Sequence, residues 1–403
     1  MKNVTLQHAL TALGALALGA LILFGLLPAL WGAPEMPAMS GGGFGSQTSR
    51  AQVVEIIEQG EVDLGGIVQP YEVMRIEVLE GEYRGILMEI DYGRRQVRAT
   101  GLTFAPGDEI LVTIGVRPDG LVTAYFADVV RVRPLLALLG VFVAAILLIS
   151  RWKGLRSLLA MGFSLAVIIN FIIPYILSGR DPVQVSILGA AVLLAVTLYV
   201  TYGWTLKTHA SVLGMLLVLV ITGTLAWLFV VIARLTGQGS EDALFLLQLT
   251  DAQINLRGLL LGGMIIGALG VLDDLVTTQS AAVFELHATD PALGLGDLFI
   301  RAMRIGQDHV AATVNTLVLA YAGASLPMLL LFTLGRGDYA RLVNYEFVSE
   351  EIVRTLVGSL GLITAVPLTT LIAAALALYA HRLGRLRAFL GPETSGEGHG
   401  HAH

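Results

Sequence analysis

The sequence predicts an α-helical polytopic membrane protein with a small extracytoplasmic β-barrel or β-sandwich domain in its N-terminal third. Of the 403 residues, 55% are hydrophobic and 14% are charged, whereas soluble domains carry about 25% charged residues. Several apolar stretches approach the roughly 20 residues that an α-helix needs to cross a bilayer. A segment of opposite character, with nine arginines and fourteen carboxylates, interrupts them at residues 50–133.

Residues 1–33 are predicted to be a transmembrane anchor. The apolar run from Ala9 to Leu30 is longer than the roughly 7–15 residues in the core of a cleavable signal peptide. Residues 34–49 are rich in glycine, proline and serine. Such a composition does not build a packed core, so this segment is predicted to be a flexible linker.

Residues 50–133 are predicted to form the β domain, with about five to seven strands. Apolar and polar residues alternate along Tyr71–Leu79 and Ile110–Val116, and a period of two is typical of half-buried strands. Turn residues separate these runs, for example at Pro106-Gly107-Asp108. A small barrel and a sandwich both fit the pattern.

Residues 134–387 are predicted to be a bundle of about seven spans, of which the sixth is broken. The apolar stretches are 135–150, 157–177, 183–202, 212–233, 256–286, 309–334 and 355–380. Counted from the N-terminal anchor as the first span, the sixth is the stretch 256–286, which is interrupted by Asp273 and Asp274, and this predicts a broken or re-entrant helix. Residues 388–403 are expected to be a disordered cytoplasmic tail that contains histidines.

The positive-inside rule predicts that both termini are cytoplasmic and that the β domain is extracytoplasmic. In that arrangement more of the lysines and arginines near helix ends face the cytoplasm. All three lysines of the chain, Lys2, Lys153 and Lys207, fall on that side.

Polar residues in the sixth and seventh spans are the candidate site. Ionisable groups in a membrane segment are costly, so they are expected to face the bundle interior or an aqueous path. In the predicted topology both groups lie at similar depth in the cytoplasmic half, where they can converge. A plainer alternative is that they mark helix ends. The candidate ion-binding residues are Asp273, Asp274, Thr278, Gln279, Glu285, Asp308, Asn315 and Thr316.

Two further groups have separate expected roles. His309 is expected to be a proton relay, a role for which histidine is suited as a residue type. Gly263, Gly267 and Gly270 are expected to let neighbouring helices pack closely, as small residues do in membranes.

The same segments resemble a known family. Gly267–Asp274, Gly306–His309 and Asn315–Pro327 are similar to the corresponding motifs of the YibE/F family of bacterial multi-pass membrane proteins. The resemblance implies an N-terminal anchor, an exported β domain and a helical bundle in the bacterial plasma (inner) membrane. It implies no substrate. Gln307 stands where an arginine is common in similar sequences, so this position is not assigned a charged role.

The leading functional hypothesis is a proton-coupled secondary transporter that exports a small ion. Asp273, Asp274 and Asp308 are candidate ligands for a divalent cation, which is expected as substrate and not as cofactor. Oxygen ligands without thiolates favour Mg²⁺ or Mn²⁺, while phosphate is an alternative if helix N-termini face the substrate. An ion channel gated by the β domain is a second hypothesis, and a non-transporting scaffold or sensor is a third.

Several classes are excluded or disfavoured by the sequence. The chain has no Walker motif, no His-Glu-x-x-His, no Gly-x-Ser-x-Gly and no cysteine, so it is not predicted to be an enzyme or an ATP-driven pump. A net charge of −6 gives no sign of nucleic-acid binding. The expected partners are the lipid bilayer and a small ion, and the oligomeric state stays open, with a homo-oligomer as one alternative.

Overall fold

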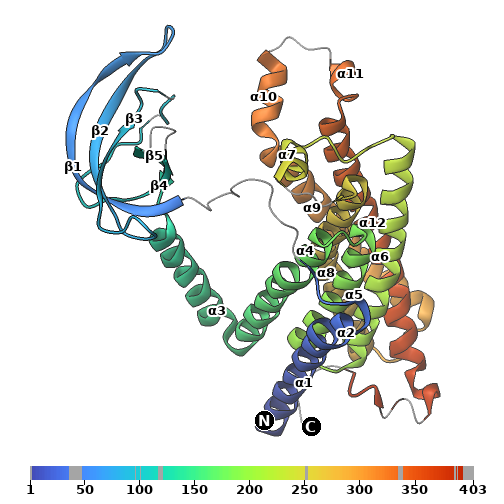
Figure 1. The fold of residues 1–403 in the computed structure, drawn as a ribbon. Coiled ribbons are helices and arrows are strands. Elements are labelled where there is room, and N and C mark those ends of the chain that lie inside the picture. Colours follow the sequence, from blue (N-terminus) through green and yellow to red (C-terminus); the bar gives the residue numbers. More distant parts are fainter. Residues whose placement is uncertain are drawn as a thin grey trace. The chain divides into compact units, whose positions relative to one another are not determined.

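The chain folds into two compact units, Met1–Ala38 with Ile149–His403, and Met39–Leu148. The computed structural model describes residues 2–35, 48–95, 97–99, 101–116, 121–249, 253–334, 339–384, 387 and 389–393. Figure 1 shows a helical bundle and a curled β-sheet, which confirms the predicted fold class. Most of the predicted linker, and the predicted tail from residue 394 onward, lie outside the described residues.

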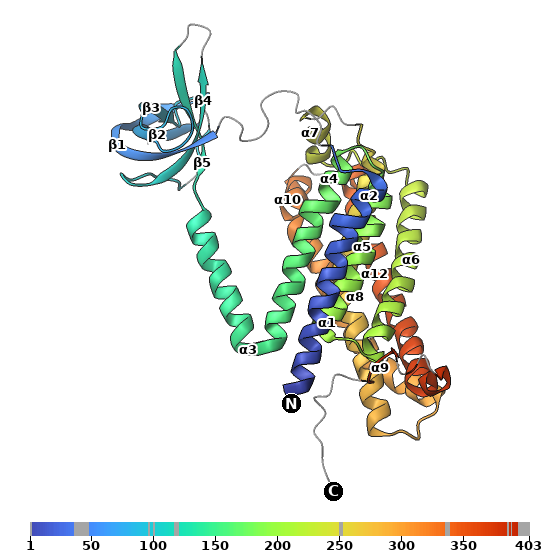
Figure 2. The ribbon, with the colours of Figure 1, turned by 60° about the horizontal axis from the view of Figure 1, so that its bottom comes forward.

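The β domain is one antiparallel sheet of five strands. Their order is β3-β2-β1-β4-β5, and the sheet curls into a half-barrel (Figure 2). Of the two predicted alternatives, the structure agrees with the barrel, because the five strands form one curled sheet and not the two stacked sheets of a sandwich. The strands are β1 (Thr48–Asp63), β2 (Val68–Val78), β3 (Leu87–Tyr92), β4 (Glu109–Val116) and β5 (Val122–Val129).

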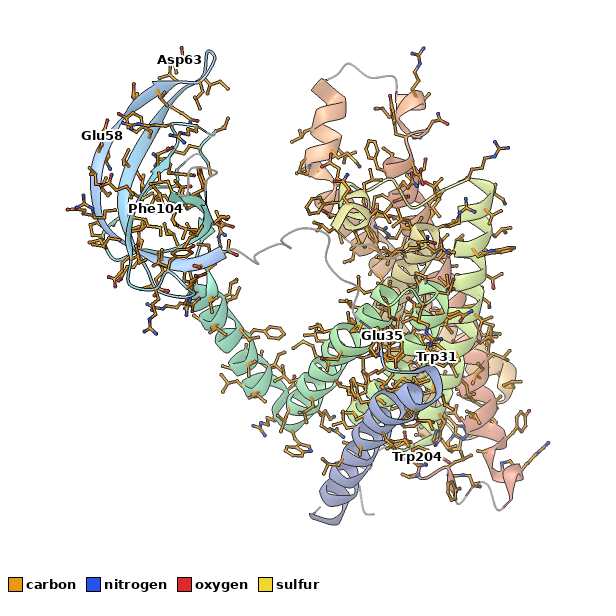
Figure 3. The ribbon with its side chains drawn as sticks, viewed as in Figure 1. Trp31, Glu35, Glu58, Asp63, Phe104 and Trp204 are labelled. Atoms are coloured by element: carbon orange, nitrogen blue, oxygen red, sulfur yellow. The ribbon has the colours of Figure 1, made fainter. Side chains whose placement is uncertain are left out.

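Alternate residues of these strands fill the inside of the curl. Met74, Ile76 and Ile110 are fully buried, as the period-two pattern requires. Phe104, labelled in Figure 3, packs edge-on against Tyr92 with ring centroids 5.4 Å apart. The alternation read from the sequence therefore marks the core of this domain.

The N-terminal span is helical but contains one widened turn. Helix α1 (Lys2–Leu21) passes through a π-helical turn at Ile22–Leu26 into α2 (Leu27–Trp31). Pro28 explains the turn, because proline has no N–H to donate and its ring clashes with the carbonyl four residues back. Ala12–Trp31 is long and apolar enough to cross a membrane.

Two predicted spans lie in one long helical stretch, Val132–Leu177. Helix α3 (Val132–Val167) continues through a π-helical turn into α4 (Ile173–Leu177), but it kinks at Arg151, where φ is 46° and ψ is −123°. The stretch has 46 residues, or roughly 69 Å at 1.5 Å per residue, more than twice the thickness of the hydrocarbon core. The boundary between the two units, after Leu148, falls beside the kink.

The remaining helices complete the bundle. They are α5 (Pro182–Tyr202), α6 (Leu206–Ile232), α7 (Glu241–Leu249), α8 (Leu256–Thr289), α9 (Leu295–Ala324), α10 (Leu326–Leu334), α11 (Tyr339–Leu342) and α12 (Glu346–Tyr379). Helices α6, α8 and α12 pack against one another, α9 packs on α8 and α12, and α5 packs on α8 and α1.

Six described helical stretches qualify as membrane spans, compared with the eight apolar stretches read from the sequence. Two of the eight merge in the stretch that includes α3. The predicted span 309–334 is absent from the six because Ser325 separates α9 from α10 and because α9 is amphipathic, with polar residues along one side. The chain is thus a membrane protein with about six candidate spans.

The predicted break in the sixth span is wrong. Helix α8 runs unbroken from Leu256 to Thr289. The Thr277 hydroxyl donates to the backbone carbonyls of Asp273 and Asp274, at 2.9 and 3.0 Å, and the Thr278 hydroxyl also donates to the Asp274 carbonyl. The helix continues past the two carboxylates, which project sideways from it.

Close helix packing uses glycines other than the three predicted. A Cβ added at Gly361 of α12 would lie 2.6 Å from the Thr222 hydroxyl of α6, and one at Gly214 of α6 would lie 2.7 Å from the Thr369 hydroxyl of α12. By contrast, a Cβ at Gly263, Gly267 or Gly270 would meet no atom within 4 Å. Within the described part of the chain these three glycines therefore make no close helix contact, and their predicted packing role stays a prediction.

The last described residues of the chain fasten onto the start of α6. The Leu206 N–H donates to the Pro392 carbonyl (2.9 Å) and the Lys207 N–H donates to the Glu393 carbonyl (3.2 Å). The Trp204 indole, labelled in Figure 3, donates to the Phe389 carbonyl at 2.9 Å. This C-terminal strap supplies acceptors for N–H groups that have no partner within their own helix.

Candidate functional site

Asp273 lines a cavity of about 260 Å³ between three helices of the bundle, open on one side where Ser157, Met161 and Gly270 are exposed. The cavity lies between the second half of α3, the end of α5 and the middle of α8. The Asp273 side chain is half-buried, and the described residues that line the cavity include no basic side chain. A carboxylate thus faces this space without a cationic partner in its wall.

Hydroxyl groups supply most of the other polar atoms of this cavity, from Ser157, Ser164, Thr197, Thr201 and Tyr202. Two of them already use their proton within their own helix. The Ser164 hydroxyl donates to the Ala160 carbonyl at 3.0 Å, and the Thr197 hydroxyl donates to the Leu193 carbonyl at 2.7 Å. Their oxygens therefore present only lone pairs to the cavity, which suits a cation and not an anion.

Asp274 faces away from this cavity, toward α9. Its Oδ2 lies 3.7 Å from His309 Nε2. The Asp274 side chain is 78% exposed and that of His309 is 32% exposed, so water screens the pair. The structure thus brings together one predicted carboxylate and the predicted proton relay, at the level of Asp273 on the neighbouring face of α8.

Gln279 is buried and ties three helices together. Its Nε2 donates to the Ala302 carbonyl of α9 at 2.9 Å and to the Thr370 hydroxyl of α12 at 2.6 Å. Only 3% of the residue is exposed. Its side chain is committed to packing, and it does not line the Asp273 cavity.

The remaining predicted residues lie on the outer surface of the bundle. Asp308, Asn315 and Thr316 are exposed along one side of α9, and Thr278 and Glu285 are exposed on α8. Among the described residues, no group of three or more His, Asp or Glu side chains could hold a metal ion. The predicted metal ligands Asp273, Asp274 and Asp308 are therefore not gathered in one cluster.

The three glycines of α8 each line a cavity. Gly270 lies beside Asp273 in the cavity described above. Gly267 lines a space of about 10 Å³, and Gly263 lines one of about 970 Å³ at the start of the helix. Their lack of side chains keeps space open along α8.

The cavity-lining hydroxyls are not among the residues predicted from the sequence, although their spacing carries a signal. Thr197 and Thr201 are four residues apart, and Ser157 and Ser164 are seven apart. Both spacings place two hydroxyls on one face of a helix. An isolated serine or threonine is common in a membrane helix, so this signal becomes visible only when the facing carboxylate is known.

The comparison with protein families agrees with these segments. The family model described as YibE/F-like protein matches residues 138–378, a range that includes α8, α9 and the Asp273 cavity. No curated protein and no solved structure matches the chain. Because the match covers more than half of the 403 residues, the chain belongs to the YibE/F-like family.

Proposed function

We propose that this membrane protein is a secondary transporter that exports a small cation with proton coupling. The observation that carries the proposal is the Asp273 cavity, in which a carboxylate of α8 faces hydroxyl oxygens from two helices, α3 and α5. Carboxylate and neutral oxygens are the ligands that Mg²⁺ and Mn²⁺ prefer. The cation is the cargo and not a resident cofactor.

The size of the cavity fits a partly hydrated ion. A water molecule takes about 30 Å³ of liquid volume, so the roughly 260 Å³ hold about eight water-sized groups. Mg²⁺ in proteins usually keeps several waters and binds one or two carboxylates. A single carboxylate with surrounding hydroxyls is therefore sufficient to hold it weakly, as transport requires.

The neighbouring pair supplies the proton step in this proposal. Asp274 follows Asp273 on α8, and its Oδ2 lies 3.7 Å from Nε2 of His309 on α9. Histidine is a common proton carrier in proteins, and a proton bound at this pair can couple to the charge bound at Asp273. The coupling is electrostatic, because the two carboxylates belong to adjacent residues.

The test is flux of Mn²⁺ in proteoliposomes that contain the full chain. Asp273→Asn removes the charge and keeps the shape, and we expect at least a tenfold loss of saturable flux. Asp297→Asn is the matched control, since it makes the same change at an exposed position of α9, and its flux should match the wild type. If the Asp273→Asn variant transports Mn²⁺ at the wild-type rate, the proposed site is refuted.

The same preparation separates the channel and scaffold hypotheses from transport. Unitary currents in planar bilayers would assign the chain as a channel. A scaffold would give neither flux nor current in any variant. We expect a saturable Mn²⁺ flux, together with a proton flux that depends on the imposed Mn²⁺ gradient.

A further inference from the structure

Helix α9 runs alongside the apolar middle of a candidate membrane span. A Cβ added at Gly306 of α9 would collide with Val366 of α12, and one added at Gly358 of α12 would lie 3.6 Å from Leu317 Cδ2 of α9. Residues 306–317 of α9 therefore lie beside residues 358–366, in the middle of the span Glu346–Arg382. This part of α9 is thereby set at the depth of the hydrocarbon core.

The side of α9 that faces away from α8 and α12 is polar at this depth. Its members recur every three or four residues, which places them on one face of the helix, and they extend over a rise of about 22 Å. We call them the α9 stripe, and all of them are exposed: Arg304, Asp308, Ala311, Ala312, Asn315 and Leu319.

Asn315 is the least favourable member of this stripe in contact with lipid. Its carboxamide is exposed and makes no hydrogen bond within the part of the chain that the structure describes. Asn170 is also exposed, but its Nδ2 donates to the Ala166 carbonyl of its own helical segment at 3.0 Å. Lipid chains offer no hydrogen-bond partner, so Asn315 needs a polar group from outside this segment.

The neighbours of Asn315 allow another helix to approach closely. Ala311 and Ala312 lie about one turn before it and present only methyl groups. The exposed Thr316 hydroxyl donates to the Ala312 carbonyl at 3.0 Å, so its oxygen remains available as an acceptor. Small residues together with Asn and Thr are typical of helix–helix interfaces in membranes.

The α9 stripe is complementary to itself. A carboxamide both donates and accepts, so two copies of Asn315 can satisfy each other across a two-fold axis. Arg304 and Asp308 have opposite charges, lie four residues apart, and form no ion pair with any described residue. In a parallel pair of α9 helices, Arg304 of each copy can meet Asp308 of the other, as an isologous interface requires.

We infer that the α9 stripe is the interface between two copies of this chain, related by a two-fold axis along the membrane normal. A partner of a single charge sign would leave either Arg304 or Asp308 unpaired, whereas a second copy pairs both. The inference does not rest on the proposed transport function. It gives Asp308 and Asn315 a role separate from the Asp273 cavity.

The first test measures the association of the full chain in liposomes. The chain contains no cysteine, so Glu61→Cys, at an exposed position of β1, carries one fluorophore whose bleaching steps are counted at decreasing protein density. We expect pairs that separate on dilution. Asn315→Leu should weaken the pair about tenfold, because it removes two interhelical hydrogen bonds, and Asn315→Gln should retain most of the affinity.

Asn170→Leu is the matched control, because it makes the same change at an exposed asparagine whose amide already has a partner. Its association should equal that of the wild type. Single copies at every density of the wild-type chain would overturn the inference and leave water as the occupant of the stripe. Equal association of the wild type and Asn315→Leu would overturn it as well.

Charge reversal tests the parallel pairing. Arg304→Asp places acidic residues opposite each other in the pair, and Asp308→Arg places basic ones, so each change should weaken association severalfold. The two changes in one chain restore opposite charges and should restore association. A double variant that associates no better than either single variant would refute this pairing.

Disulfide formation locates the interface. We expect Ala311→Cys and Leu319→Cys to form linked dimers on mild oxidation, with yields severalfold above that of Val220→Cys, a residue that is 65% exposed on α6. Equal yields at the three positions would overturn the assignment of the interface to α9. A linked dimer in a chain that shows no Mn²⁺ flux would keep the interface and refute transport, so the two failures are distinguishable.

Discussion

Glu58 shows how neighbouring side chains set the acidity of a single carboxyl in the β domain. Its Oε1 accepts hydrogen bonds from the Tyr71 hydroxyl at 2.6 Å and from Arg94 NH2 at 2.5 Å. These two donors, Tyr71 first, lower the pKa of Glu58 below its ordinary value. The side chain lies on the exposed side of β1, labelled in Figure 3.

The sign of the resulting pH effect follows from the lowered pKa. The bonds to Glu58 stabilise the β domain above the pKa of an unfolded glutamate, about 4.3, and this contribution is lost as the pH falls through the lower folded pKa. We expect Tyr71→Phe to raise the pKa of Glu58 toward 4.3. Carboxyl NMR of glutamate-labelled protein, assigned with Glu58→Gln, measures it, and an unchanged pKa would contradict the assignment.

Individual site residues were predicted unevenly. The sequence marked Asp273, Asp274 and His309 because ionisable groups are rare in apolar segments, and this argument needs no structure. It could not divide the two carboxylates between two environments, because adjacent helix positions differ by about 100° and only the neighbours decide what each meets. Gln279 shows the same limit, since a buried amide serves packing as readily as binding.

At the scale of elements, helix α8 combines two kinds of glycine environment. Gly262 packs tightly, since an added Cβ would lie 2.4 Å from the Ser186 hydroxyl of α5, whereas Gly263 beside it faces open space. Gly258 and Gly262 are four residues apart, and so are Gly263 and Gly267, so spacing does not distinguish the two environments. Sequence alone therefore identifies the small-residue stripe but not which glycines touch a neighbouring helix.

This difference predicts opposite effects of the same substitution. Gly361→Ala should destabilise the bundle by about 1–3 kcal/mol, as overpacking does, because its Cβ would meet the Thr222 hydroxyl at 2.6 Å. Gly267→Ala should stabilise it by about 0.5–1 kcal/mol, because alanine favours the helix and open space accepts the methyl. Unfolding in mixed micelles measures both, and adding Thr222→Ala should rescue Gly361→Ala. Equal effects at the two positions would refute the packing argument.

The span count shows why element boundaries were harder to predict than element type. Hydropathy identified the apolar helices, but the expected break at Asp273 and Asp274 does not occur, because the two carboxylates leave the helical backbone intact. In α9 the reverse holds. Enough polar residues lie along one side of this helix that it is not among the candidate spans, although its apolar side packs on α8 and α12.

At the scale of the whole molecule, the bundle and the β domain are separate compact units, and the family match covers the bundle but not the β domain. The alternating pattern was sufficient to predict a small β domain, but it left a barrel and a sandwich open, and the structure shows one curled antiparallel sheet. The order of its strands was not predictable, because β1 pairs with both β2 and β4, and the second pairing joins residues far apart in the sequence.

The orientation of the whole chain is the remaining prediction. The positive-inside rule places the β domain outside and the α8–α9 loop inside. We expect a thiol at Glu61→Cys, on β1, to react with an impermeant maleimide in intact spheroplasts. A thiol at Gly294→Cys, in the loop before α9, should react only after permeabilisation. The reverse pattern would invert the topology.

The C-terminal strap has a consequence for biogenesis. Trp204 and its partner Phe389 are 185 residues apart in sequence, so at about 5–20 residues per second the ribosome needs roughly 10–40 s to make the second after the first. During that interval the first amides of α6 have no access to the carbonyls of Pro392 and Glu393. The start of α6 is therefore completed after synthesis of the bundle, and a nascent chain arrested before Phe389 should expose this surface to proteases and chaperones.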